Sequence, residues 1–225
     1  NESAIILVDL FLRNNIRFKI RMPEMNFFEV HIVKDIVAYL SLAINTHDAR
    51  QLDQICNKGI LYLKENQRYR AIQNCQKKHI SVFEAIDEQM NYVDPFYRNR
   101  SSRFRNVMTE ISKRSPVEAI SILMKSGYET YLKEKRFDTG KIEILQILAK
   151  QEPTIEGFLN RLRELKRLLN QGFASEYETP IILSTIHSSK GLEYDTVYMV
   201  DVYEGRFPSS KPNMFCRSKD SADGE

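Results

Sequence analysis

The sequence predicts an α/β domain that is interrupted by a mainly α-helical inserted domain. Residues 1–44 follow a helix, strand, helix pattern, whereas residues 45–178 consist of helical stretches and almost no strand-like runs. Short apolar runs typical of buried strands return in residues 179–225. Because the two flanking segments share the α/β pattern, we expect them to form one domain around the helical insertion.

The first segment begins with a predicted helix over residues 3–15. Ile5, Val8 and Leu12 recur at the spacing that places side chains on one helical face. Residues 16–20 then alternate apolar and charged side chains, which is typical of a half-buried strand.

A second helix is predicted from about residue 29 to residue 44. Its apolar stripe contains Ile32, Val33, Ile36, Val37, Leu40 and Ala43. Lys34 and Asp35 are expected to face outward, as a solvated side of this helix. Aromatic pairs at a helix start, such as Phe27 and Phe28, are usually core residues.

The middle segment carries two clear helix starts. Ser115 precedes Pro116 and Glu118, which together predict an N-cap, a first-turn proline and a capping box. Thr154 opens another helix, with an apolar stripe that runs to Leu169 and a glycine, Gly172, just beyond. These signals favour an all-α bundle.

An arginine-rich aromatic stretch lies within this bundle, comprising Tyr92, Phe96, Tyr97, Arg98, Arg100, Arg103, Phe104 and Arg105. Such a mixture suits phosphate contact and base stacking. A helix that buries its aromatic rings and solvates its arginines explains the pattern at least as well.

The last segment contains two predicted buried strands, residues 181–186 and 196–202, with a polar loop between them. Loops at the carboxyl ends of α/β strands are where ligands bind. In this loop Lys190 is suited to a phosphate, Glu193 to a sugar hydroxyl, and His187 to a nucleic-acid backbone. A solvated turn remains the alternative interpretation of these residues.

Composition excludes several classes of protein. The net charge of +3 neither indicates nor excludes a nucleic-acid partner. Three scattered cysteines do not form a complete disulfide framework, which favours a reducing, cytoplasmic setting, and no metal-ligand spacing occurs. Neither a membrane span nor a secretory signal is predicted. The chain starts with Asn and ends in polar residues, so we expect it to be part of a longer protein.

The loop from Thr185 to Glu193 has the pattern T-x-H-x-x-K-G-L-E, and Glu204 to Pro208 follow it as E-G-R-F-P. These two blocks resemble motif V and the E-G-x-F-P run of UvrD/PcrA/Rep-like superfamily 1 DNA helicases. Phe27 to Leu40 resemble motif IVa of the same family, with Ile32-Val33 where Glu-Ile is usual. Gly127 to Leu132 resemble its G-Y-x-x-Y-L stretch.

The resemblance covers almost the whole chain and implies a specific architecture. Residues 1–44 and 179–225 would be parts of the RecA-like 2A motor domain, and residues 45–178 would be the helical 2B domain inserted into it. By similarity, Thr185 and His187 contact single-stranded DNA, and the motif IVa residues Phe28 and Glu29 lie near the DNA path. A duplex contact through the loop at residues 57–60 of 2B is left open, because its glycine motif is imperfect.

The same resemblance places Lys190, Gly191 and Glu193 on the ATP side of motif V, with Glu193 bonded to the ribose. No G-x-x-x-x-G-K-[ST] loop occurs in the sequence, and the family's Asp-Glu and motif VI are also missing, so no catalytic set is complete. ATP and Mg²⁺ are therefore expected to act in the complete protein, together with its motor domain 1A. The fragment alone is predicted to bind neither and to be inactive.

Two other functions compete with a 3′-to-5′ DNA helicase or translocase of repair or replication. The first is the motor subunit of an AddA- or RecB-like helicase–nuclease, against which the E-G-x-F-P run argues. The second is a helicase-like DNA-binding or protein-docking scaffold without a working motor, which residues of this segment do not test.

Overall fold

The computed structural model describes residues 4–21, 26–90, 95–171, 181–200 and 202. The chain divides into two compact units, Asn1–Ser188 and Ser189–Glu225. Within the first unit, one continuous hydrophobic core extends from Ile5 to Leu165. The predicted E-G-x-F-P run at Glu204 to Pro208 lies outside the described residues.

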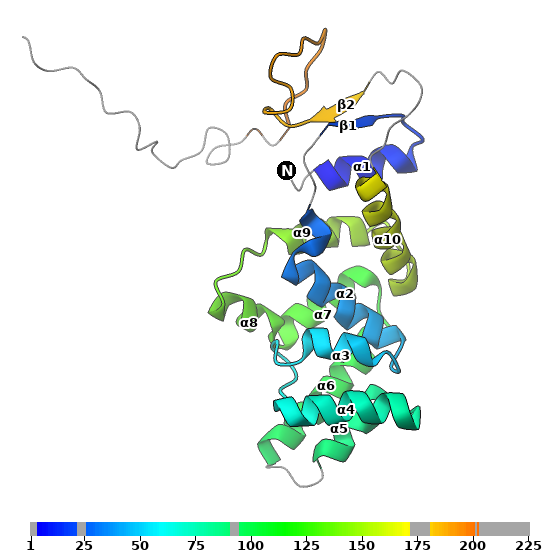
Figure 1. The fold of residues 1–225 in the computed structure, drawn as a ribbon, viewed down its shortest axis with the longest axis vertical. Coiled ribbons are helices and arrows are strands. Elements are labelled where there is room, and N and C mark those ends of the chain that lie inside the picture. Colours follow the sequence, from blue (N-terminus) through cyan, green and yellow to red (C-terminus); the bar gives the residue numbers. More distant parts are fainter. Residues whose placement is uncertain (1–3, 22–25, 91–94, 172–180, 201, 203–225) are drawn as a thin grey trace, which may run out of the picture. The chain divides into compact units, whose positions relative to one another are not determined.

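Helices dominate the first unit (Figure 1). The elements up to residue 90 are α1 (Ala4–Arg13), β1 (Lys19–Arg21), the 3-10 turn η1 (Asn26–Glu29), α2 (His31–Ile44), α3 (Ala49–Ile55), α4 (Glu65–Lys78) and α5 (Val82–Met90). After them come α6 (Pro95–Ile111), α7 (Pro116–Leu123), the π-turn η2 (Met124–Tyr128), α8 (Glu129–Glu134), α9 (Gly140–Ala149), α10 (Ile155–Gln171) and β2 (Ile182–Ser184).

Local helix signals in the sequence are confirmed. The Ser115 hydroxyl accepts from the Glu118 amide, and the Glu118 carboxylate accepts from the Ser115 amide at 3.1 Å, so α7 starts with a capping box. The Thr154 hydroxyl accepts from the amide of Gly157 at 3.1 Å at the start of α10. Helices were also expected near residues 3–15 and 29–44, where α1 and α2 lie.

Strands β1 and β2 pair in parallel, with Ile20 opposite Leu183 (Figure 1). This pairing brings together two segments that flank the helical region in the sequence. The strand predicted at residues 196–202 is not formed in its described part, and Tyr198 is 88% exposed. That prediction was wrong because apolar β-type residues indicate only a tendency, whereas a strand also needs a neighbour that supplies its hydrogen bonds.

Helix α2 is the centre of the first unit, since it packs against α3, α6, α9, α10 and η1. Its Asp35 is only 2% exposed, so the prediction that Asp35 faces outward was wrong. Asp35 lies on the same helical face as Ile32 and Tyr39, three residues before it and four after it, and this face is buried.

Three donors make the burial of Asp35 possible. Its Oδ1 accepts from Lys58 Nζ at 2.6 Å and from Gln54 Nε2 at 2.5 Å, and its Oδ2 accepts from the Tyr128 hydroxyl at 2.9 Å. Burial and the nearby Asp35 carboxylate raise the pKa of Tyr128, which keeps its hydroxyl protonated as a donor. A buried carboxylate satisfied in this way links α2 to the end of α3 and to η2.

The loop held by Lys58 crosses directly over η2. Gly59 has φ +94°, and a Cβ built on it would lie 2.8 Å from the carbonyl oxygen of Gly127. Gly127 has φ +128°. The backbone conformation therefore favours glycine at both positions, and the close approach excludes a Cβ at Gly59. Tyr39 and Arg100 secure the crossing by donating to the carbonyl oxygens of Lys58 and Gly59, at 2.6 and 3.1 Å.

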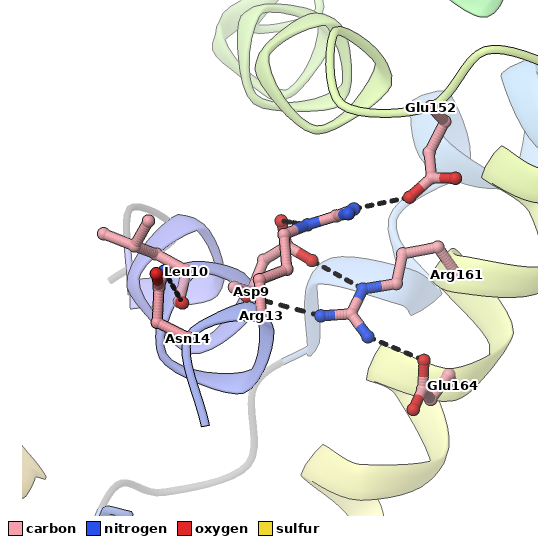
Figure 2. A network of polar contacts seen from close by, with 7 residues as sticks. All are labelled: Asp9, Leu10, Arg13, Asn14, Glu152, Arg161 and Glu164. Atoms are coloured by element: carbon pink, nitrogen blue, oxygen red, sulfur yellow. Dashed lines mark hydrogen bonds and ion pairs between the residues drawn. The ribbon is translucent and has the colours of Figure 1, made fainter. Parts of the chain in front are cut away.

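A second ionic network ties the first helix to the last (Figure 2). Asp9 on α1 accepts from Arg161 Nε of α10 at 2.6 Å and from Arg13 Nε at 2.8 Å. Arg13 also reaches Glu152 at 2.5 Å, and Arg161 reaches Glu164 at 2.7 Å. Because Asp9 is buried, this network fixes α10, whose chain continues toward β2, against α1.

Substitution of Asp35→Asn is expected to lower the free energy of unfolding by about 3 kcal/mol, because one amide cannot replace a carboxylate that accepts three hydrogen bonds beside an ammonium group. Urea unfolding monitored by circular dichroism measures the change. Asp53→Asn is the matched control, since Asp53 is 61% exposed and its pair with Arg68 spans 3.4 Å, so its loss should stay below about 1 kcal/mol. Equal losses in the two variants would contradict the role of Asp35.

Substitution of Gly59→Ala is expected to cost about 2 kcal/mol or more, because the new Cβ meets backbone atoms that do not move independently. Gly140→Ala is the control: it lies in α9, and its nearest neighbour is the Asp138 side chain at 3.4 Å. The control should change stability by less than about 1 kcal/mol. Urea unfolding measures both variants. An unchanged free energy of unfolding in Gly59→Ala would refute the close crossing of the two backbones.

Candidate nucleotide and nucleic-acid interface

The predicted loop begins with a turn directly after β2. The Thr185 Oγ1 atom accepts from the amide of Ser188 at 3.1 Å and donates to the Ser188 hydroxyl at 2.9 Å. This local hydroxyl turn ends the strand and determines the path of the chain between the two residues. His187, inside the turn, is exposed, so its imidazole is accessible to a ligand.

The remaining predicted residues of the loop lie in the second unit. Lys190, Gly191 and Glu193 are exposed. A hydrogen bond of 3.0 Å from the Leu192 amide to the Ser189 carbonyl closes a turn around Lys190 and Gly191, and Glu193 follows this turn. Gly191 has φ +79°, and nothing lies within 4 Å of the place of a Cβ. This glycine is therefore explained by backbone conformation and not by crowding. An ammonium in the turn and a carboxylate directly after it are thus exposed to solvent, which suits a phosphate and a sugar hydroxyl.

The motif IVa aromatic residues belong to the core. Phe27 and Phe28 are 2% and 8% exposed, and their rings meet edge to face with centroids 5.3 Å apart. In this arrangement Phe28 offers little surface on which a base could stack. A DNA contact by Phe28 stays a prediction, while its packing beneath the start of α2 is what the geometry supports.

Glu29 lies at the end of η1 with two lysines around it. Its carboxylate accepts from Lys34 Nζ at 2.7 Å and from Lys166 Nζ at 2.8 Å. The hydrogen bonds from Lys166 and then Lys34 lower the pKa of Glu29 to about 2, so the group is ionised at neutral pH. The sequence interpretation missed Lys166, because a pairing across 137 residues has no local signal.

The arginine-rich aromatic stretch mostly matches the alternative in which a helix buries its aromatic rings. Phe104 is fully buried, and Arg105 lies 5.6 Å from the ring of Phe83 while it also pairs with Asp87. Arg103 donates to the carbonyl oxygen of Ser126 at 3.1 Å. Tyr92 lies outside the described residues. Arg103 and Arg105 therefore contribute to packing within the first unit, and Arg98 is exposed.

Among the described residues, no group of three or more His, Cys, Asp or Glu side chains is arranged to hold a metal ion. Within the same part of the chain, none of the helices has the length and apolar character needed to cross a membrane.

The described residues form a largely helical unit with one pair of parallel strands, and exposed polar residues follow the second strand. Residues 1–219 match the family model of the UvrD-like helicase C-terminal domain. The chain therefore belongs to the UvrD-like helicase C-terminal domain family.

Several curated proteins are similar to the chain. DNA helicase II of Escherichia coli is 22% identical, with 93% of this chain and 31% of that protein covered. DNA helicase II of Rickettsia typhi is 23% identical, with 90% and 32% covered. A putative ATP-dependent DNA helicase, YjcD of Bacillus subtilis, is 25% identical, with 92% and 28% covered. The chain spans about a third of the length of these relatives.

The Thr185 turn gives a direct structural prediction. Thr185→Val keeps the β-branched shape and removes the acceptor of the Ser188 amide, so that amide should exchange its hydrogen about five- to tenfold faster, as expected for the loss of one hydrogen bond. Thr185→Ser keeps the hydroxyl and should preserve the protection. Amide exchange followed by NMR measures both variants, and equal protection in all three proteins would show that the hydroxyl does not hold the turn.

Proposed function

We propose that this chain is the C-terminal motor portion of an ATP-dependent DNA helicase that moves 3′ to 5′ along single-stranded DNA in repair or replication. The observation that carries the proposal is the exposed polar loop that follows β2 in a chain of the UvrD-like family. Several relatives are named DNA helicases, which supports DNA as the substrate. The protein would act in the cytoplasm.

In this proposal residues 1–44 and 179–225 belong to the 2A motor domain and residues 45–178 to the inserted 2B domain. The parallel pair of β1 and β2 supports this division, because it joins the two flanking segments. The remaining motor domain, 1A, is the partner within the same polypeptide. It would supply the phosphate-binding loop and the Mg²⁺ ligands that this sequence lacks.

The loop would serve two ligands at once. Thr185 and His187, in the hydroxyl turn, contact the DNA strand through its backbone. Lys190 and Glu193 lie on the nucleotide side, where the ammonium meets phosphate and the carboxylate accepts from the ribose. Gly191 gives the backbone the conformation that the turn between them requires. ATP with Mg²⁺ supplies the phosphoryl transfer in the complete protein, and this chain contributes orientation and a change of grip on DNA.

The complete protein should hydrolyse ATP slowly alone and much faster with single-stranded DNA. Glu193→Ala should reduce the stimulated rate about tenfold or more and raise the KM for ATP, because the ribose contact is lost. Glu110→Ala is the matched control, because Glu110 is an exposed carboxylate on α6. It should leave the DNA-stimulated rate and the KM for ATP unchanged. A coupled assay over a range of ATP concentrations provides both constants.

The two possible failures have different meanings. A folded complete protein without ATP hydrolysis would overturn the motor and leave a DNA-binding or docking scaffold as the better account. Normal stimulated hydrolysis by Glu193→Ala would preserve the motor but remove Glu193 from the nucleotide site.

A further inference from the structure

Two lysines from distant elements converge on one carboxylate at the start of α2. Lys34 of α2 and Lys166 of α10 each approach a different oxygen of Glu29, at 2.7 and 2.8 Å. Each ammonium group is thereby directed at one oxygen of the same anion. A phosphodiester also presents two oxygens that share one negative charge, so the two lysines form an arrangement that can accept a phosphate in place of the carboxylate.

Stability of the fold does not explain this cluster. The Glu29 side chain is 54% exposed, and those of Lys34 and Lys166 are 41% and 45% exposed. Ion pairs with this exposure contribute little to folding, because water screens them and long side chains lose freedom in forming them. The carboxylate can therefore leave the lysines and be solvated at small cost, so another anion can take its place.

The surroundings extend the positive charge along α10. This helix carries four cations, Arg161, Arg163, Lys166 and Arg167, against two carboxylates, Glu156 and Glu164. One carboxylate, Glu164, is already bound by Arg161, which also binds Asp9. Arg163 is exposed, lies one turn before Lys166, and donates to the neutral side chain of Asn160. A polyanion that reaches Lys166 therefore meets further positive charge beside it.

We propose that Lys34 and Lys166 form a subsite for a backbone phosphate of DNA, and that Glu29 occupies this subsite as an internal competitor when DNA is absent. The inference rests on the proposed function, since it requires that the complete protein binds DNA. It assigns Glu29 an electrostatic role opposite to that of a direct contact: the carboxylate weakens DNA binding. The apparent affinity is reduced by the fraction of molecules in which Glu29 holds the lysines.

The test measures binding of a fluorescent oligothymidylate to the complete protein at several salt concentrations. Glu29→Gln should bind about three- to tenfold more tightly at low salt. The slope of log affinity against log salt should steepen by about 0.7 for one added phosphate contact. Lys34→Gln and Lys166→Gln should each weaken binding. In the double variant Glu29→Gln with Lys166→Gln, the gain from Glu29→Gln should disappear, which a purely structural role of Glu29 would not produce.

Glu88→Gln is the matched control for net charge. Glu88 accepts from Lys78 with both oxygens at 2.8 Å and is also exposed, but it lies on α5. Its substitution changes the charge of the protein by the same amount as Glu29→Gln. The affinity of Glu88→Gln should stay within about twofold of the wild type, since one distant surface charge is largely screened.

The outcomes separate this inference from the proposed function. If Glu29→Gln weakens binding, or matches Glu88→Gln, while the wild type still shows DNA-stimulated hydrolysis, the subsite is refuted and the helicase function stands. Unchanged binding by both lysine variants refutes it equally. If the wild type neither binds oligothymidylate nor responds to DNA, the proposed function and the subsite are both overturned.

Discussion

The buried charge of Asp35 is the constraint on which the centre of the structure depends. A carboxylate in the interior of α2 must be surrounded by donors, and these come from the end of α3, the loop after it and η2. Lys58, held by Asp35, precedes Gly59, which lies against Gly127 with no room for a side chain on Gly59. The contacts of Asp35 therefore lie beside the crossing of the two glycines and join α2 to η2.

A second carboxylate with charged donors, Asp9, holds the first and last described helices together. Asp9 holds α10 against α1 through Arg161. The strands that follow these two helices in the sequence, β1 and β2, pair in parallel. The pairing of Arg21 with Ser184 ends this ladder directly before Thr185. The polar loop is therefore anchored on its amino-terminal side by a strand that pairs with a segment far earlier in the sequence.

Local patterns in the sequence predicted local structure well. The Ser115 capping box and the start of α10 at Thr154 follow from interactions within a few residues, and β1 and β2 lie where alternation and a short apolar run predicted strands. Asp35 was misjudged because its burial depends on donors 19 to 93 residues away. The run at residues 196–202 was misjudged for a related reason, since strand pairing is a property of two segments. For the candidate site, the motif located Thr185 to Glu193, but nothing in the sequence connected Glu29 with Lys166.

Asp35 and Glu29 are both carboxylates that accept hydrogen bonds from a lysine elsewhere in the fold. They differ in burial, and this difference decides how easily each contact can be broken. The Asp35 carboxylate is only 2% exposed, so removing one of its donors leaves a charge in the core that water does not reach. Around Glu29 each partner can be hydrated, so the same contacts cost little to break. A second anion can therefore compete at Glu29 and cannot at Asp35. Lys34 and Asp35 are adjacent on α2. The buried contacts of Asp35 hold the helix in place, and Lys34 on its exposed side is thereby positioned for a ligand without rearrangement of the core.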